Sequence, residues 1–188
     1  MTDVRLAGKS VAILVANGFE ELEMTETQRA LLKAGAAVKV ISPEQGLVNG
    51  WMEAAWGHYF PVDCPVSEVL GSDFHMLVLP GGVRGIAKLK QNAHVKRIIS
   101  HFMDAGKPVA AIDQGVELLA FVQKIAGRTL TAPQSLRPLL EEAGATWSDD
   151  LIVRDGQILT AQSQEVLAAF VMQTLTLCAG EQTVQQAA

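Results

Sequence analysis

The sequence is poor in charged residues, aromatic residues and cysteine. Charged residues make up 19% and aromatic residues 5% of the 188 positions, and no run of lysine or arginine is longer than two. With a formal net charge of −5, the surface offers no basic track for a phosphate backbone or an anionic membrane. We therefore expect neither nucleic acid nor a membrane among the partners.

The two cysteines, Cys64 and Cys178, lie far apart and form no Cys-x-x-Cys or Cys/His cluster. This spacing argues against a disulfide framework and against a zinc site. The first ten residues have mixed charge, and only a short apolar stretch at 11–16 follows them, so neither a signal peptide nor a membrane span is predicted. We expect a cytoplasmic protein without a metal or cofactor.

Hydrophobic residues make up 49% of the chain, which suits one well-filled globular core. We predict a single domain over 1–188, with a core at about 8–178 and a frayed tail at 180–188. Four apolar runs read as buried strands, at 10–16, 37–42, 76–79 and 109–112. Helical patterns occur near 20–34, 92–105, 115–126, 135–143 and 164–178. This alternation predicts an α/β fold, a flavodoxin-like three-layer sandwich with helices on both faces of a mostly parallel sheet.

Two hairpins interrupt the alternation. Asn49-Gly50 is a strong turn signal within the Gly- and Trp-containing segment 46–61. Asp155-Gly156 predicts a second turn, with 152–153 facing 158–159.

Three turns follow strands of the predicted sheet, where ligands bind in doubly wound folds. They are 17–23, 79–82 and 110–115. The last turn places Asp113 on a sharp strand-to-helix bend, the position at which several hydrolases expose a nucleophile. Locally, a helix-capping aspartate is the favoured interpretation over a catalytic one. Gly81-Gly82 is either a tight turn or a place where backbone N–H groups approach a ligand.

Four segments together resemble the ThiJ/PfpI superfamily, which is related to the class I glutamine amidotransferases. They are Gly-Phe-Glu-Glu-Leu-Glu, Val-Leu-Pro-Gly-Gly, Gly-Lys-Pro-Val-Ala-Ala-Ile and Val-Arg-Asp-Gly-Gln-Ile-Leu-Thr-Ala, in the order in which the family has them. That superfamily includes intracellular protease/amidases such as the PfpI branch, the parkinsonism protein deglycase and glyoxalases without cofactors. Its members usually form homodimers or larger assemblies.

The resemblance implies roles for individual residues. Glu23 matches the glutamate that hydrogen-bonds the cysteine at the nucleophile elbow in the family, and Gly81 and Gly82 match the backbone oxyanion site that the amide of Gln114 would complete. At the elbow, however, the PfpI branch has Ala-Ile-Cys-His-Gly where this chain has Ala-Ile-Asp113-Gln114-Gly115. A PfpI glutamate that serves a neighbouring subunit falls at Ile86. All three catalytic side chains are therefore replaced.

An amide beside a carboxylate supplies neither the thiolate nucleophile nor a proton shuttle. Our leading hypothesis is a non-catalytic pseudoenzyme, a stress-related or regulatory homodimer that binds a small polar ligand or a partner at the former active site. One alternative is an enzyme of hydrolase or glyoxalase type that uses Asp113 and Glu23 as a carboxylate pair. Another is a structural scaffold.

Two further expectations concern particular side chains. An aromatic patch is formed by Trp51, Trp56, Tyr59 and Phe60, which could line a pocket or a subunit interface. Of the two, packing at the homodimer interface is the use that we expect. The family resemblance implies that the Asp113 side chain lies within hydrogen-bond reach of Glu23. Two such carboxyl groups should share a proton at neutral pH, with Glu23 protonated and Asp113 charged.

Overall fold

Seven strands build the central sheet of the protein, which is described by a computed structural model over residues 4–180. Their order is β11-β12-β8-β7-β1-β3-β6, and every pair is parallel except β11 with β12. The strands are β1 (Ser10–Leu14), β3 (Ala37–Ser42), β6 (Cys64–Pro65), β7 (Met76–Leu79), β8 (Val109–Ile112), β11 (Ile152–Asp155) and β12 (Ile158–Ala161).

The five main parallel strands follow the flavodoxin-like order. Numbered along the chain as β1, β3, β7, β8 and β12, they lie in the spatial order 2-1-3-4-5. The topological switch point therefore falls between β1 and β7, because the connections that follow these two strands run in opposite directions. In folds of this kind, ligands bind in the crevice at the carboxyl ends of the strands beside the switch point. The predicted α/β fold is confirmed.

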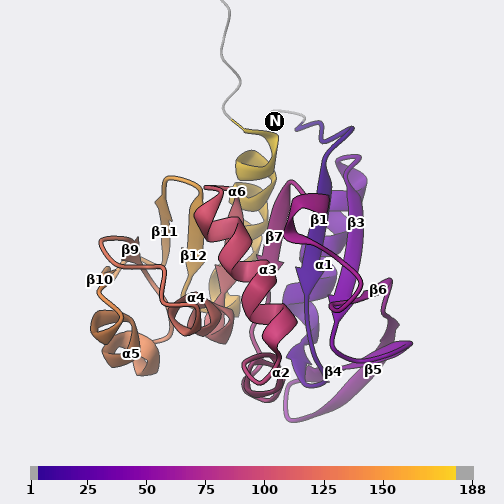
Figure 1. Ribbon diagram of the computed structural model, residues 1–188, viewed down its shortest axis with the longest axis horizontal. Helices are drawn as coiled ribbons and strands as arrows, with labels where there is room; N and C mark the ends of the chain where they lie inside the picture. Colours follow the sequence, from indigo (N-terminus) through magenta and orange to yellow (C-terminus); the bar gives the residue numbers. More distant parts are fainter. Residues whose placement is uncertain (1–3, 181–188) are drawn as a thin grey trace, which may run out of the picture.

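Helices cover both faces of this sheet (Figure 1). In β1, Val11 and Ile13 point into the core shared with α1 and α6, whereas Ala12 and Leu14 point into the core on the side of α3 and α4. Both strand faces are buried, which explains the continuous apolar run in the sequence. The helices are α1 (Glu21–Lys33), α2 (Val83–Leu89), α3 (Ala93–Asp104), α4 (Glu117–Phe121), α5 (Arg137–Glu142) and α6 (Leu167–Ala179), with 3-10 turns at Gly71–Asp73, Asp113–Val116, Gln134–Leu136 and Gln164–Val166.

Two small sheets accompany the main one. One contains β2 (Phe19–Glu20), β4 (Leu47–Met52) and β5 (Ala55–Pro61), and the other pairs β9 (Thr129–Leu130) with β10 (Thr146–Trp147). In Figure 1 the β4–β5 hairpin lies with α2 at the end of the molecule opposite the N-terminus.

The first predicted hairpin exists, but its turn was placed wrongly. Asn49 and Gly50 lie inside β4, and the chain reverses at Glu53 and Ala54, where Glu53 has a φ of 57°. The Asn49 side chain donates hydrogen bonds to the carbonyl oxygens of Gly57 and His58 on the neighbouring strand. A cross-strand bond of this kind holds the asparagine in the ladder, which the dipeptide signal does not reveal. The second predicted hairpin, β11–β12, exists, but its turn lies one residue later than predicted, at Gly156 and Gln157. Residues 152 and 153 therefore pair with 161 and 160, and not with 158–159 as predicted.

Two helices differ from the sequence-based expectation. The helix predicted at 115–126 is shorter: α4 ends at Phe121, and Gln123 adopts a left-handed φ of 58° that stops it. Helix α2, which contains Gly85 and begins after Gly82 at a φ of 110°, was not predicted. Of the tail predicted at 180–188, all but Gly180 lies outside the described residues. Within those residues, no helix has the length and apolar character needed to cross a membrane.

Candidate ligand site at the strand ends

The candidate site lies at the carboxyl ends of β1, β7 and β8, next to the topological switch. β2 and the start of α1 follow β1, the Gly81-Gly82 turn follows β7, and Asp113 follows β8 directly. The sheet therefore brings together the three turns that were predicted to meet there.

Asp113 has the strained backbone of a nucleophile elbow. Its φ is 54°, in the left-handed region that non-glycine residues seldom adopt, and it begins a 3-10 turn immediately after β8. Ile112, not Asp113, holds the cap position, so the interpretation of Asp113 as an ordinary helix cap was wrong. Strain of this kind persists where the surrounding structure imposes it, and it directs the side chain outward from the strand end.

Gly115 supports the elbow by packing against backbone. A Cβ atom on Gly115 would lie 2.1 Å from the carbonyl oxygen of Leu79 and 2.9 Å from that of Pro80. Position 115 therefore has no room for a side chain, and glycine is required there.

Glu23 is fully buried on α1 beneath the elbow. Its Oε2 accepts a hydrogen bond from the Gly81 N–H at 2.6 Å, while its Oε1 has no hydrogen-bond partner among the described residues. A Cβ atom on Gly81 would meet both Asp113 Oδ2 and Glu23 Oε2 at 2.9 Å, so the two carboxyl groups flank this glycine. Within the described part of the chain no hydrogen bond joins Glu23 to Asp113, so the predicted direct bond is absent.

Burial raises the pKa of all three carboxyl groups at this site. It raises the pKa of Glu23 to about 9, with the Asp113 charge adding to the effect. It raises the pKa of Asp113 to about 6, although the Gln114 backbone N–H opposes the shift. The pKa of Glu20 is also raised by burial, and its hydrogen bond from Gln164 acts in the opposite direction. At neutral pH Glu23 is therefore protonated and Asp113 mostly ionised, in the direction that was predicted.

Two of the three backbone donors of the predicted oxyanion site already have acceptors within the chain. Glu23 Oε2 accepts from the Gly81 N–H, and Gln114 Oε1 accepts from the Gly82 N–H at 3.3 Å. The Gln114 N–H stabilises the Asp113 carboxylate. The N–H groups of Gly81 and Gly82 would therefore have to exchange these acceptors to bind a ligand oxygen.

An open pocket of about 340 Å³ lies beside Asp113. Its lining residues come from β2, α1, the β4–β5 hairpin, the elbow and the turn before α6: Glu20, Leu22, Trp51, Met52, Glu53, Asp113, Ser163 and Gln164. Glu20 and Gln164 meet across it, with Gln164 Nε2 donating to Glu20 Oε2 at 3.1 Å. Ile86 is buried in the core on α2 and does not line this pocket.

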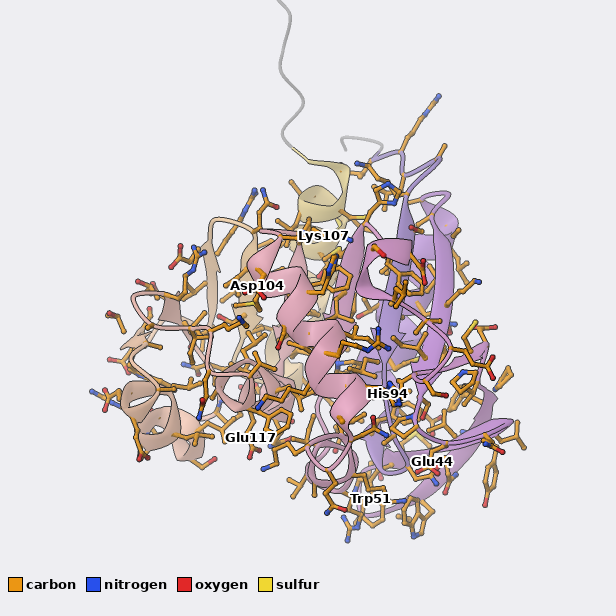
Figure 2. The ribbon with its side chains drawn as sticks, viewed as in Figure 1. Glu44, Trp51, His94, Asp104, Lys107 and Glu117 are labelled. Atoms are coloured by element: carbon orange, nitrogen blue, oxygen red, sulfur yellow. The ribbon has the colours of Figure 1, made fainter. Side chains whose placement is uncertain are left out.

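The four residues of the predicted aromatic patch lie in three different environments. Phe60 packs edge to face against Phe19 at 5.8 Å between ring centroids, so it belongs to the fold. Trp56 and Tyr59 remain 54% and 68% exposed on β5. Trp51, labelled at the lower edge of the molecule in Figure 2, lines the pocket and carries the Arg84 guanidinium 3.8 Å from its ring centroid.

Glu20 and Gln164 line the pocket although neither was predicted to do so. Glu20 is part of the first motif, Gly-Phe-Glu-Glu-Leu-Glu, but within this motif only Glu23 matched a residue with a known role in the family. Gln164 follows β12, and its place near Asp113 depends on β12 lying beside β8, which no local pattern indicates.

Comparisons with known proteins agree with this geometry. Residues 9–177 match the DJ-1/PfpI family. General stress protein 18 of Bacillus subtilis is 33% identical over 172 residues, covering 90% of this chain and 98% of the relative. A deglycase of Thermococcus kodakarensis is 32% identical over 167 residues, covering 89% and 98% respectively.

A solved structure gives the same result for the fold. The crystal structure of Drosophila melanogaster DJ-1beta is similar with a TM-score of 0.81 and 26% identity, over 92% of this chain and 91% of that one. The order of strands, the strained elbow after β8 and the matched span of sequence point the same way. This chain belongs to the DJ-1/PfpI family.

Proposed function

We propose that this protein is a non-catalytic member of its family that binds a small polar ligand in the pocket beside Asp113. The observation that carries the proposal is the elbow itself: the strained position holds an aspartate, and the N–H groups of Gly81 and Gly82 are bonded to Glu23 and Gln114. Acyl or carbonyl chemistry needs a nucleophile and free donors aimed at a developing oxyanion. An aspartate beside occupied donors is poorly suited to both tasks.

The biological setting is part of the same proposal. Relatives that carry the names of a general stress protein and of deglycases support a stress-related or regulatory role. Cys64 and Cys178 are both free thiols, which suits a reducing compartment and supports a cytoplasmic location.

An enzyme is the second candidate, and one observation favours it. Glu23, with a pKa raised to about 9, and Asp113, with a pKa raised to about 6, form a pair of carboxyl groups in different protonation states. Such pairs perform acid/base chemistry in other proteins. Against it, the two groups have no hydrogen bond to one another within the described residues, and Glu23 does not line the pocket.

A turnover screen separates these candidates. Methylglyoxal, peptide amides and isonitriles are incubated with the wild type and with Asp113→Ala, and product formation is compared with buffer. We expect no turnover above buffer with either protein, because the elbow supplies no thiolate. Turnover by the wild type that disappears in Asp113→Ala would establish the enzyme and end the non-catalytic proposal.

We also propose a homodimer, which the exposed aromatic side chains of β5 support. Trp56 and Tyr59 are large and exposed, and they share the hairpin with Leu47, which is 54% exposed on the paired strand. Sedimentation at micromolar concentration should give a mass twice the chain mass of 20.1 kDa, and the double change Trp56→Ser, Tyr59→Ser should shift it toward the monomer. A wild type that sediments as a monomer would contradict the proposal.

A further inference from the structure

A second open pocket, of about 490 Å³, shares no described lining residue with the pocket beside Asp113. Its lining comes from the loop after β1, from β4 and β5 and from α2: Asn17, Asn49, Trp56, Gly57, Tyr59 and Lys88. Trp51, which lines the first pocket, meets Trp56 edge to face at 5.4 Å between ring centroids, so the two pockets are neighbours on the hairpin. The proposed function makes no use of the second pocket.

The two asparagine side chains of this second pocket are held in fixed orientations. Asn17 Oδ1 accepts a hydrogen bond from the Asn49 backbone N–H at 2.7 Å. Asn49 Nδ2 donates to the carbonyl oxygens of Gly57 and His58 at 3.1 and 3.0 Å. Because an N–H group needs an acceptor and a carbonyl oxygen needs a donor, neither amide can be flipped. Asn17 Nδ2 and Asn49 Oδ1 have no hydrogen-bond partner among the described residues, so they offer the pocket a donor group and an acceptor.

Lys88 adds donors to the pocket without adding net charge. Its Nζ lies 3.2 Å from Glu44 Oε1, and the same oxygen accepts from the Asn17 backbone N–H at 3.4 Å. Figure 2 shows Glu44 at the same end of the molecule as Trp51. The ion pair balances the ammonium charge and leaves the ammonium group two further N–H donors. None of the described lining residues carries a carboxyl group, so the pocket is neutral as a whole and favours neither an anion nor a cation.

Two aromatic rings complete the lining of the second pocket. Trp56 and Tyr59 lie on β5, and more than half of each side chain is exposed. Exposed rings of this kind offer flat apolar surfaces to a ligand. A sugar ring matches the whole set of groups, because its C–H bonds form an apolar face while each of its hydroxyl groups both donates and accepts hydrogen bonds.

We propose that this second pocket binds a carbohydrate, a neutral pyranose whose ring lies against Trp56. Its hydroxyl groups accept hydrogen bonds from Lys88 Nζ and Asn17 Nδ2 and donate one to Asn49 Oδ1. The proposal goes beyond the ligand-binding function proposed for the first pocket and does not depend on it. Trp56 and Tyr59 also belong to the surface proposed for the homodimer, so the sugar would lie at the boundary between the subunits.

Methyl glycosides test the proposal, because the methyl group blocks the aldehyde that would otherwise react with lysine side chains. The methyl pyranosides of glucose, galactose and mannose are each titrated into the full-length, ¹⁵N-labelled protein. Sorbitol supplies hydroxyl groups without a ring face, and cyclohexanol supplies a ring with a single hydroxyl group. The NMR signal of the Trp56 indole N–H, identified by its loss in Trp56→Phe, reports the pocket. We expect saturable shifts with at least one glycoside, with a Kd on the order of 10 mM, and none with sorbitol or cyclohexanol.

Two variants locate the sugar in the pocket. Asn17→Asp keeps the acceptor for the Asn49 N–H and removes the free donor group, and Lys88→Met keeps the aliphatic part of the side chain and removes the ammonium group. Each should weaken glycoside binding about tenfold. Lys124→Met is the matched control, because Lys124 is also paired with a carboxylate but lies outside the pocket, and it should leave the affinity unchanged. Thermal melting shows whether each variant is folded, and loss of one pocket variant leaves the other as a test.

Three results would overturn the carbohydrate proposal. They are the absence of saturable shifts with every glycoside, equal or tighter binding of sorbitol or cyclohexanol, and unchanged glycoside affinity in the folded pocket variants. None of these results bears on the function proposed for the pocket beside Asp113, which the turnover screen decides. The homodimer is decided separately, by sedimentation of the protein without sugar.

Discussion

Replacing Glu23 by glutamine should make the protein more stable than the wild type at neutral and alkaline pH. Glutamine keeps an acceptor for the Gly81 N–H and removes a carboxyl group that is fully buried. The folded wild type holds the Glu23 proton up to about pH 9, whereas the unfolded chain releases it near the ordinary value of 4.5. The stabilising contribution of the Glu23 carboxyl is therefore complete below the unfolded pKa and is lost as pH rises through the folded one.

The size of the effect follows from the width of this pH window. Each pH unit between the two pKa values changes the free energy of unfolding by up to about 1.4 kcal/mol. From about pH 5 to about pH 7, Glu23→Gln should gain about 3 kcal/mol relative to the wild type. Burial also raises the pKa of Asp113 to about 6, but Asp113 is present in both proteins, so its titration cancels from the difference between them.

Urea denaturation at a series of pH values measures this difference. Glu26→Gln, on the exposed face of the same helix and paired with Arg29, controls for the loss of one formal negative charge. A free-energy difference between Glu23→Gln and the wild type that stays flat with pH would show that Glu23 carries no raised pKa in the folded protein.

Replacing Gly115 by alanine should destabilise the protein by about 3 kcal/mol or more, because the added methyl group overlaps fixed backbone. Its Cβ would lie 2.1 Å from the Leu79 carbonyl oxygen and 2.9 Å from both the Leu79 carbonyl carbon and the Pro80 carbonyl oxygen. These backbone atoms cannot rotate away as a flexible side chain can. Helix propensity alone predicts the opposite sign, since alanine is favoured over glycine in a helical turn. The expected loss therefore reports the tight packing of the elbow on the end of β7.

Gly106→Ala is the matched control for this experiment. Gly106 has a left-handed φ of 61°, and no non-neighbouring atom lies within 4 Å of the place that an added methyl group would take. Alanine there meets backbone strain without a steric clash. It should cost about 1 kcal/mol, the usual penalty for a left-handed alanine. Denaturant midpoints for both variants decide the matter: a Gly115→Ala variant within the loss seen for Gly106→Ala would mean that the elbow can move away from β7.

The local sequence predicted the bounds of the strands better than the positions of the turns. The strands at 37–42, 76–79 and 109–112 have the bounds that were predicted. At 76–79 and 109–112 every residue is buried, because both faces of a central parallel strand are covered, so the apolar run ends where the strand does. Asn49-Gly50 failed as a turn for a tertiary reason. A Cβ at Gly50 would lie 2.7 Å from Glu21 Oε2, so the glycine is needed in the strand to let α1 approach.

At the candidate site, too, the sequence predicted the residues but not the contacts between them. Asp113, Gln114, Glu23 and the Gly81-Gly82 turn were identified from motif order, and they lie together at the ends of the strands. Their hydrogen bonds were not predictable, because the acceptor that reaches each N–H depends on side-chain rotamers across three separate elements. The same limit applied to Gln164, which reaches Glu20 over a separation of 144 residues.

By itself the sequence determined the family resemblance, the alternation of strands and helices and the presence of Asp113 at the elbow position, because these features depend on residue identity, order and periodicity. The tertiary structure alone decided that the Gly81 and Gly82 N–H groups are occupied and that three carboxyl groups share one end of the sheet. The physical reason is that burial and hydrogen-bond pairing are set by groups distant in the chain, which meet only when β12, β8, β7 and β1 lie side by side.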